Sequence, residues 1–247
     1  MRKFLAVAAF LAVSVALHAQ ISLPYPGPGV PSTGPSFVQA TSCHGTTATG
    51  ACTTSAITVT SGHTLAFCAG QNAVSTLNSL AISTGTNNLA SFTQAFTPGS
   101  SSGATLDCRY LLSTNATGST TFTATFSATN NMVLIVYELI VPNGFDGTAP
   151  SPVGTFTAGQ TTINCPSYTT THAAALVICA GYSSSGLSSA TASSGFTIPS
   201  GGSVTTAGVG SNGAVEYQAR VGGGTALTPS VTITSSSGTW GATFAFY

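Results

Sequence analysis

From about residue 41 to the end of the chain, short runs of β-branched and aromatic residues alternate with clusters of Gly, Ser, Asn and Pro. This spacing is typical of strands joined by turns, and no segment shows a persuasive 3.6-residue apolar period with helix caps. We expect strands over residues 56–60, 63–69, 79–83, 90–96, 104–113, 120–127, 132–141, 161–168, 173–182, 213–221, 230–235 and 239–247.

The expected strands are of two kinds. In one, Phe122, Ala124 and Phe126 alternate with threonines, so one face packs and the other meets water. In the other, residues 132–137 and 174–179 are apolar throughout, as in central strands covered on both faces. The two kinds together predict an all-β fold, a single jelly-roll-like β-sandwich of about ten to twelve strands with two sheets packed face to face.

The first residues have the layout of a secretory signal peptide. Arg2 and Lys3 precede an apolar run from Phe4 to Leu17, and small residues follow, so we assign residues 1–19 to the signal. The run is too short to span a bilayer, and no later stretch reaches about 18 uninterrupted apolar residues. We therefore expect a secreted protein, extracellular or at the cell surface, with no membrane span in the mature chain.

Residues 20–40 form a Pro-rich segment, with prolines at 24, 26, 28, 31 and 35. Prolines at this density forbid a helix and favour an extended arm or linker. It is either a flexible spacer, which we favour, or an ordered segment that inserts into a neighbour. Its apolar residues for such insertion are Ile21, Leu23, Tyr25, Val30 and Phe37. Residues 41–247 form the β-sandwich domain.

Charge is nearly absent from the mature chain. Without Arg2 and Lys3, two arginines remain against four acidic residues, a net charge of −2. Such a surface cannot steer a polyanion, which excludes nucleic acid as a partner. The mean hydropathy of +0.38 argues for folding over disorder. A surface of hydroxyls and amides favours contact with copies of the same chain or with neutral glycans.

All six cysteines lie after the expected cleavage site, which predicts a set of disulfides. No CxxC or zinc-finger spacing points to a metal. The pattern L-x-x-C-A-G occurs at residues 65–70 and 176–181, so these two strands are candidate neighbours. That placement would pair Cys68 with Cys179, leaving Cys43 to close a short loop with Cys52 and Cys108 to pair with Cys165; the sequence alone does not fix the connectivity.

Candidate acidic groups are few. Asp107 and Arg109 lie two residues apart on an expected strand, and we interpret them as a solvent-exposed ion pair. Glu138 and Glu216 are the best acidic candidates for a site or for a buried pair with Arg220.

The three histidines after the signal, His44, His63 and His172, stand beside small polar residues without an adjacent acidic residue, so we place them on the surface. No H-E-x-x-H spacing and no G-x-S-x-G elbow occurs. We predict no catalytic residue, no cofactor and no metal. Trp240 opens the last expected strand, and we interpret it as a packing anchor in preference to a sugar platform.

Four segments resemble a family of exported bacterial β-sandwich domains: residues 56–65 (AITVTSGHTL), 118–127 (GSTTFTATFS), 135–138 (IVYE) and 238–246 (GTWGATFAF). The resemblance covers about residues 55 to 247 and implies secretion and a sandwich, with no known catalytic activity. Here Glu138 is followed by Leu139 and Ile140 where the family has Tyr-Ser-Gly.

These features favour a non-enzymatic extracellular structural protein that assembles with itself, as a filament or surface-layer subunit. The alternative is a carbohydrate-binding or adhesive module, and an enzyme ranks third. The expected arm would give head-to-tail contacts, which propagate unless a rotation closes a ring.

Overall fold

β-Strands dominate the residues that the computed structural model describes, which are 34–45, 49–101, 104–146, 157–205 and 210–247. All of them belong to one unit, Thr33–Tyr247. Among them the single helical element is one 3-10 turn, η1 (Leu89–Ser91). The all-β class predicted from the alternating and continuous apolar runs is confirmed.

The first half of the chain builds a six-stranded antiparallel sheet, here called the N-terminal sheet, in the order β1-β11-β4-β8-β6, with β7 also paired to β8. Its strands are β1 (Ser36–Gly45), β4 (Thr64–Gln71), β6 (Thr93–Gln94), β7 (Gly99–Ser101), β8 (Ala104–Leu111) and β11 (Met132–Ile140). β11 is buried along all but its last residue, as its apolar sequence predicts for a central strand, and β4 is also buried along its whole length.

A smaller sheet covers the N-terminal sheet on one face. It has the order β2-β10-β5, formed by β2 (Ala51–Thr53), β10 (Phe122–Phe126) and β5 (Leu77–Ile82). In β10 the phenylalanines and Ala124 are buried and the threonines between them are half-buried, so the alternation predicted from the sequence is confirmed. Beside it, β3 (Ile57–Val59) pairs with β9 (Gly118–Thr120).

The second half of the chain builds another six-stranded antiparallel sheet, the C-terminal sheet, in the order β12-β19-β14-β17-β16, with β15 also paired to β19. Its strands are β12 (Thr157–Asn164), β14 (Ala175–Ser183), β15 (Ala190–Thr191), β16 (Ser203–Val204), β17 (Asn212–Val221) and β19 (Ser230–Phe246). A short pair joins β13 (Tyr168–Thr169) to β18 (Ala226–Leu227).

The two large sheets share one strand order. Five strands form the main path of each sheet. If they are numbered by their order in the chain, their order across either sheet is first, fifth, second, fourth, third. The L-x-x-C-A-G sequences lie on the second strand of each sheet, β4 and β14. The cysteines of the two sequences lie on opposite faces, however. Cys68 points into the core between the large sheets, and Cys179 points away from it. The strand order is therefore repeated, whereas the sequence echo does not mark equivalent positions.

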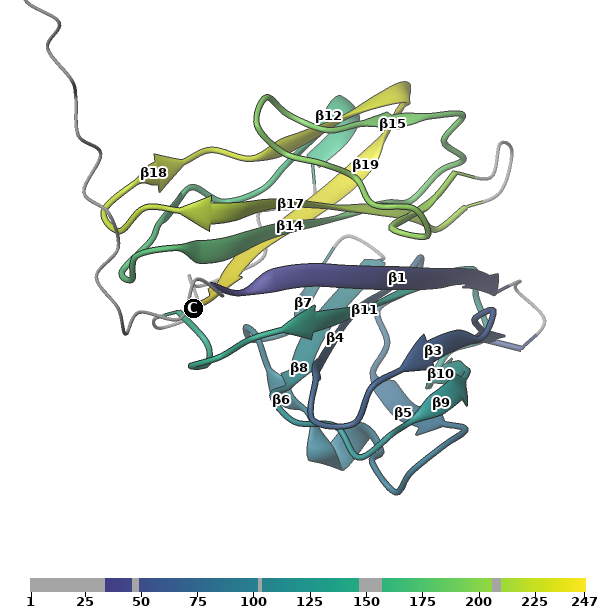
Figure 1. Cartoon of the computed structure of the whole chain (residues 1–247). Coiled ribbons are helices and arrows are strands. Elements are labelled where there is room, and N and C mark those ends of the chain that lie inside the picture. Colours follow the sequence, from purple (N-terminus) through teal and green to yellow (C-terminus); the bar gives the residue numbers. More distant parts are fainter. Residues whose placement is uncertain (1–33, 46–48, 102–103, 147–156, 206–209) are drawn as a thin grey trace, which may run out of the picture. The chain divides into compact units, whose positions relative to one another are not determined.

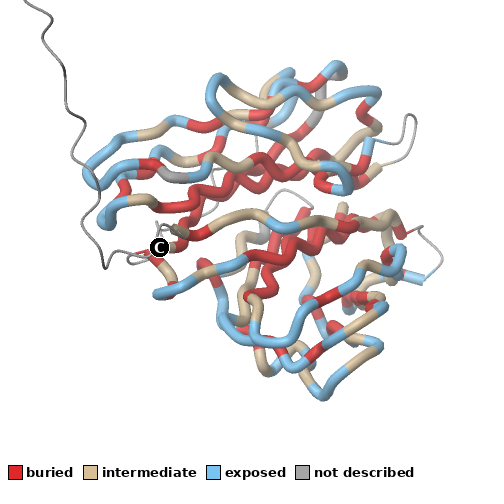
Figure 2. Tube along the Cα trace, in the orientation of Figure 1, coloured by how far each residue is buried: buried red, intermediate tan, exposed pale blue. Residues whose placement is uncertain are grey.

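The two large sheets lie face to face (Figure 1), and their facing strands are largely buried (Figure 2). Their apolar side chains form one central core. The N-terminal sheet contributes Leu106, Ile135 and Tyr137, and the C-terminal sheet contributes Ile178 and Phe244. A second core lies between the N-terminal sheet and the small β2-β10-β5 sheet. A third lies on the other side of β14, beneath β12 and the first part of β19. The β-sandwich is thus covered on both outer faces, which explains why its central strands are apolar on both sides.

The jelly-roll part of the prediction is not confirmed. Each large sheet takes all its strands from one half of the chain, residues 36–140 or 157–246, so neither sheet mixes strands of the two halves. The described residues form 19 strands, more than the expected ten to twelve, because several pairings of two or three residues carry too few apolar positions to be recognised in the sequence.

Strand bounds differ from prediction at several places, including the following three. The run at residues 90–96 is interrupted, because Asn88 caps η1 and only Thr93–Gln94 pairs as β6. The two strands expected at the end of the chain are one continuous strand, β19. β1 begins at Ser36, so the last residues assigned to the arm are part of the sheet.

Three disulfides use all six cysteines: Cys43–Cys52, Cys68–Cys108 and Cys165–Cys179. The first is the predicted pair, and the other two pairings are wrong. β4 and β14 belong to different sheets, and Cys68 and Cys179 face opposite ways, so they cannot meet. Cys68 instead lies directly across from Cys108 in the β4–β8 register.

Candidate functional site

All four acidic side chains of the protein are buried. Asp107 is 2% exposed, and Glu138, Asp146 and Glu216 are 0% exposed. A buried carboxylate is tolerated only when hydrogen-bond donors or a cation compensate for lost hydration. Each of these residues is therefore the centre of a polar cluster, and the four clusters are the candidate sites of the molecule.

Glu138 accepts hydrogen bonds from three parts of the N-terminal half. Gln39 on β1 lies opposite it in the sheet register and donates from Nε2 at 2.6 Å. The backbone N–H of Thr60 donates at 2.8 Å, and Nδ1 of His63 lies 2.7 Å from Oε1. His63, which we placed on the surface, is half-buried, and sheet pairing gives it an acidic partner 75 positions away in the sequence.

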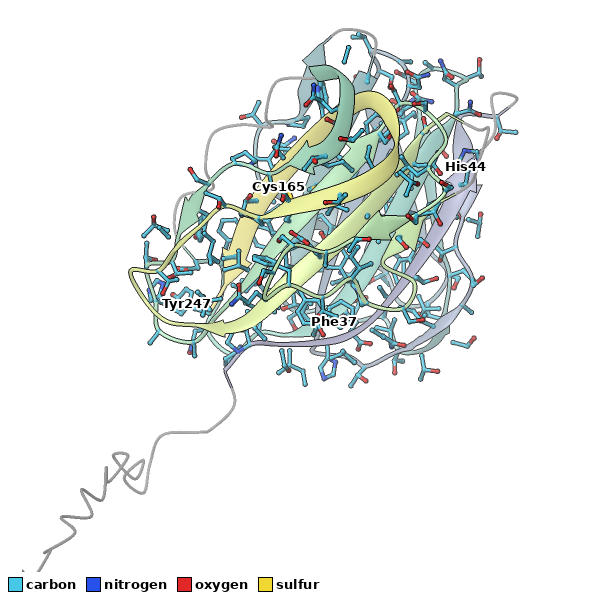
Figure 3. All side chains as sticks on the ribbon, turned by 90° about the horizontal axis from the view of Figure 1, so that it is seen from above. Phe37, His44, Cys165 and Tyr247 are labelled. Carbon is cyan, nitrogen blue, oxygen red and sulfur yellow. A yellow bond between two sulfur atoms is a disulfide. The ribbon has the colours of Figure 1, made fainter. Side chains whose placement is uncertain are left out.

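Asp146 forms the corresponding cluster in the second half. Its carboxylate accepts the backbone N–H and the hydroxyl of Thr171, and Nδ1 of His172 lies 2.5 Å from Oδ1. Burial raises the pKa of Asp146, but the hydrogen bonds from Thr171 and His172 outweigh it and hold the pKa below its ordinary value. The ring of His172 stacks on Tyr247, with 3.6 Å between centroids (Figure 3). His172 lies at the surface, as predicted, but it has an acidic partner that its sequence neighbours do not indicate.

Glu216 on β17 accepts from the backbone N–H and the hydroxyl of Ser193, at 2.7 Å and 2.9 Å. Burial raises the pKa of Glu216, and the hydrogen bonds from Ser193 only partly offset this rise. The side chain of Arg220, the cation expected to pair with Glu138 or Glu216, lies outside the described part of the chain. His44, the third histidine, lies with Nε2 2.9 Å from the carbonyl oxygen of Gly210.

Asp107 and Arg109 form the expected ion pair, because residues two apart on β8 share one face of the sheet. Nε of Arg109 donates to both carboxylate oxygens at 3.1 Å, and Nη2 donates to Oδ2 at 2.8 Å. The prediction of solvent exposure is wrong, since the side chains are only 3% and 16% exposed. The β5–η1 segment covers this face, and a cavity remains between it and Arg109.

These arrangements differ in what they can do chemically. The carboxylates of Glu138, Asp146 and Glu216 are occupied by donors from adjacent loops and strands, so they fix those segments in place. Within the described residues, no three His, Cys, Asp or Glu side chains gather in a group that could hold a metal. Asp107 and Arg109, in contrast, line a cavity.

Aromatic side chains mostly serve packing. Trp240 is 3% exposed and lies in the central core, as the packing interpretation predicts. Of the residues proposed for the arm, Phe37 lies on β1 and stacks on Tyr217, with 4.6 Å between centroids and 9° between planes (Figure 3). The remaining arm residues, Ile21, Leu23, Tyr25 and Val30, lie outside the described residues.

The chain matches no protein family, no curated protein and no solved structure. The resemblance to exported bacterial domains therefore stays a prediction. Among the described residues, no helix is long and apolar enough to cross a membrane.

Proposed function

We propose that the mature chain is a non-enzymatic extracellular structural protein that assembles with copies of itself into a filament or surface layer. The observation that carries the proposal is the burial of all four acidic side chains. The signal peptide expected over residues 1–19 and the three disulfides support secretion into an oxidising compartment.

A surface with so few charges lowers the usual barrier to association. Like charges on a protein surface keep copies apart, and this chain exposes no acidic side chain for that purpose. Arg109 is neutralised by Asp107 and is 16% exposed. Surfaces of Ser, Thr, Asn and Gln can form hydrogen bonds between copies without overcoming electrostatic repulsion.

The edge strand β12 is the best candidate for a contact between copies. It ends the C-terminal sheet in the described residues, and its sequence, TAGQTTIN, has no charge and no proline to block pairing with another strand. At the corresponding edge of the N-terminal sheet, side chains of β1 are already engaged, with Gln39 donating to Thr58 and Thr41 donating to Ser55. The proposal therefore assigns the contact to β12 in preference to β1.

The proposed test measures particle size by light scattering for residues 20–247, from low salt to about 1 M salt, where charge interactions are screened beyond about 3 Å. We expect assemblies larger than a monomer that persist at high salt. Thr161→Lys places a charge on β12 and is expected to weaken association at least about ten-fold. Ser119→Lys, on the exposed position of β9, is the matched control and should assemble normally.

A protein that stays monomeric at high concentration contradicts the proposal. If Thr161→Lys and Ser119→Lys affect assembly equally, β12 is not the contact between copies. The arm requires a separate variant lacking residues 20–32, because a longer deletion would approach β1 and the Phe37–Tyr217 stack. Unchanged assemblies in this variant would show that the arm has no role.

A further inference from the structure

A cleft with both apolar and polar lining opens on the face of the N-terminal sheet that is turned away from the C-terminal sheet. On β8, Leu106 and Cys108 point into the central core, so Asp107 and Arg109 point the other way. There Arg109 meets β5 and η1 at a cavity of about 380 Å³. A second hollow of about 200 Å³ adjoins it and shares Arg109 as a lining residue. We call the two together the Arg109 cleft.

The charged groups that line the Arg109 cleft sum to no net charge. The Asp107 carboxylate binds Nε and Nη2 of Arg109, which cancels the charge of the guanidinium and holds its plane in one orientation. Nη1 makes no hydrogen bond to the described residues and is left to donate to a ligand. A fixed planar donor of this kind suits a ligand with closely spaced oxygen acceptors.

Side-chain amides and small apolar groups complete the lining. Asn78 on β5 is exposed and makes no side-chain hydrogen bond to the described residues. Asn88 uses Oδ1 to cap η1 through the N–H of Ala90, which leaves its amide N–H groups free to donate. Leu89 and Ala90, which are not buried, provide apolar surface in the same lining. The cleft thus combines donors, acceptors and apolar patches at short range, in a volume within the usual range of about 300–1,000 Å³ for ligand sites.

We propose that the Arg109 cleft binds a neutral saccharide of one or two rings. Sugar rings carry adjacent hydroxyls that both donate and accept hydrogen bonds, which matches Asn78, Asn88 and the free Nη1 of Arg109. Their C–H faces match the apolar surface of Leu89 and Ala90. An anionic or cationic ligand fits less well, because Arg109 and Asp107 are already paired with each other and neither charge is available to a ligand. Because no aromatic residue is found among the described residues that line the cleft, we expect dissociation constants of the order of millimolar.

The proposed test is a titration of the ¹⁵N-labelled mature protein, followed by amide NMR shifts. The probes are glucose, N-acetylglucosamine and their β1,4-linked disaccharides. We expect at least one saccharide to shift the amides of β5, η1 and β8 in a saturable manner. Ser79→Trp places a bulky ring at an exposed lining position and should abolish the shifts.

Two further variants distinguish the cleft from the rest of the surface. Asn78→Ala should weaken binding about ten-fold, the loss expected for one direct hydrogen bond. Asn143→Ala is the matched control, because Asn143 is also exposed and lines neither part of the cleft. It should bind as tightly as the unchanged protein.

A peptide of residues 20–37 is the competing probe, since a neighbour's arm could fill the same cleft. Saturable shifts with this peptide and none with the saccharides would overturn the proposal, as would shifts that Ser79→Trp leaves intact. Saccharide binding does not depend on the proposed self-assembly. Particle size and saccharide shifts are separate measurements, so failure of one is distinguishable from failure of the other.

Discussion

The ring of Tyr182 on β14 lies against the backbone of Gly70 on β4, closer than a side-chain Cβ at residue 70 would allow. Both residues are on the second strand of their sheets, so this contact lets the two large sheets approach at their centres. Burial raises the pKa of Tyr182 well above its ordinary value, and its hydroxyl lies 3.0 Å from Oγ of Ser211. The ring therefore cannot move aside without breaking a buried hydrogen bond.

Gly70→Ala should destabilise the fold by about 1–3 kcal/mol, the cost of overpacking a filled core. The measurement is the free energy of unfolding in urea. Gly222→Ala is the matched control, because residue 222 is exposed and a Cβ there would meet only Oγ1 of Thr225 at 3.6 Å. Equal effects of the two substitutions would contradict the close contact of Gly70 with Tyr182.

Glu138→Ala should destabilise the protein by roughly 3 kcal/mol or more, because it removes the acceptor of three donors. Gln39→Ala removes only one of these hydrogen bonds and should cost about 1 kcal/mol. Urea unfolding of both variants gives the comparison. A small loss in Glu138→Ala, similar to that of Gln39→Ala, would show that Glu138 does not organise the cluster.

The contributions of Asp146 and Glu216 to the free energy of unfolding should change with pH in opposite directions. The folded pKa of Asp146 is lowered, so its contribution is present above the ordinary value of 3.8 and is lost as the pH falls from there through the folded pKa. The folded pKa of Glu216 is raised, so its contribution is greatest below the ordinary value of 4.5 and declines as the pH rises through the folded pKa.

The free energy of unfolding should therefore be measured from about pH 2 to pH 8 in three proteins. Compared with the unchanged chain, Asp146→Asn should lose less stability below pH 3.8. Glu216→Gln should lose less stability than the unchanged chain as the pH rises above 4.5. Slopes that change in the same direction in both variants would contradict the opposite pKa shifts.

The Cys68–Cys108 disulfide should contribute more stability than Cys43–Cys52. It closes a loop of 40 residues instead of 9, which in the chain-entropy relation is a difference of about 1 kcal/mol. Replacing each pair by alanines and comparing urea unfolding tests the order. Peptide mapping without reduction tests the connectivity itself, and a fragment linking Cys68 to Cys179 would contradict the strand arrangement.

Much of the fold could be predicted from the sequence because the signals are local. Strand type follows from the alternation or continuity of apolar residues, as in β10 and β11, and the cysteines of an exported chain predict disulfides. The Asp107–Arg109 pair was also predictable, since two positions on one strand share a face whatever the rest of the fold. Burial of that pair was not, because the covering segment is β5 with η1.

The tertiary structure alone decided the contacts between residues that are distant in the sequence. His63 and Glu138 are 75 positions apart and meet because β4 pairs with β11, and neither residue's neighbours in the sequence indicate the other. The same holds for Cys68 and Cys108, which the sheet register places opposite each other while the sequence echo pointed to Cys179. The sequence by itself determined that the chain is all-β and almost uncharged. The placement of every acidic group inside the protein was decided by sheet order and register, because burial of a charge depends on donors supplied by other strands.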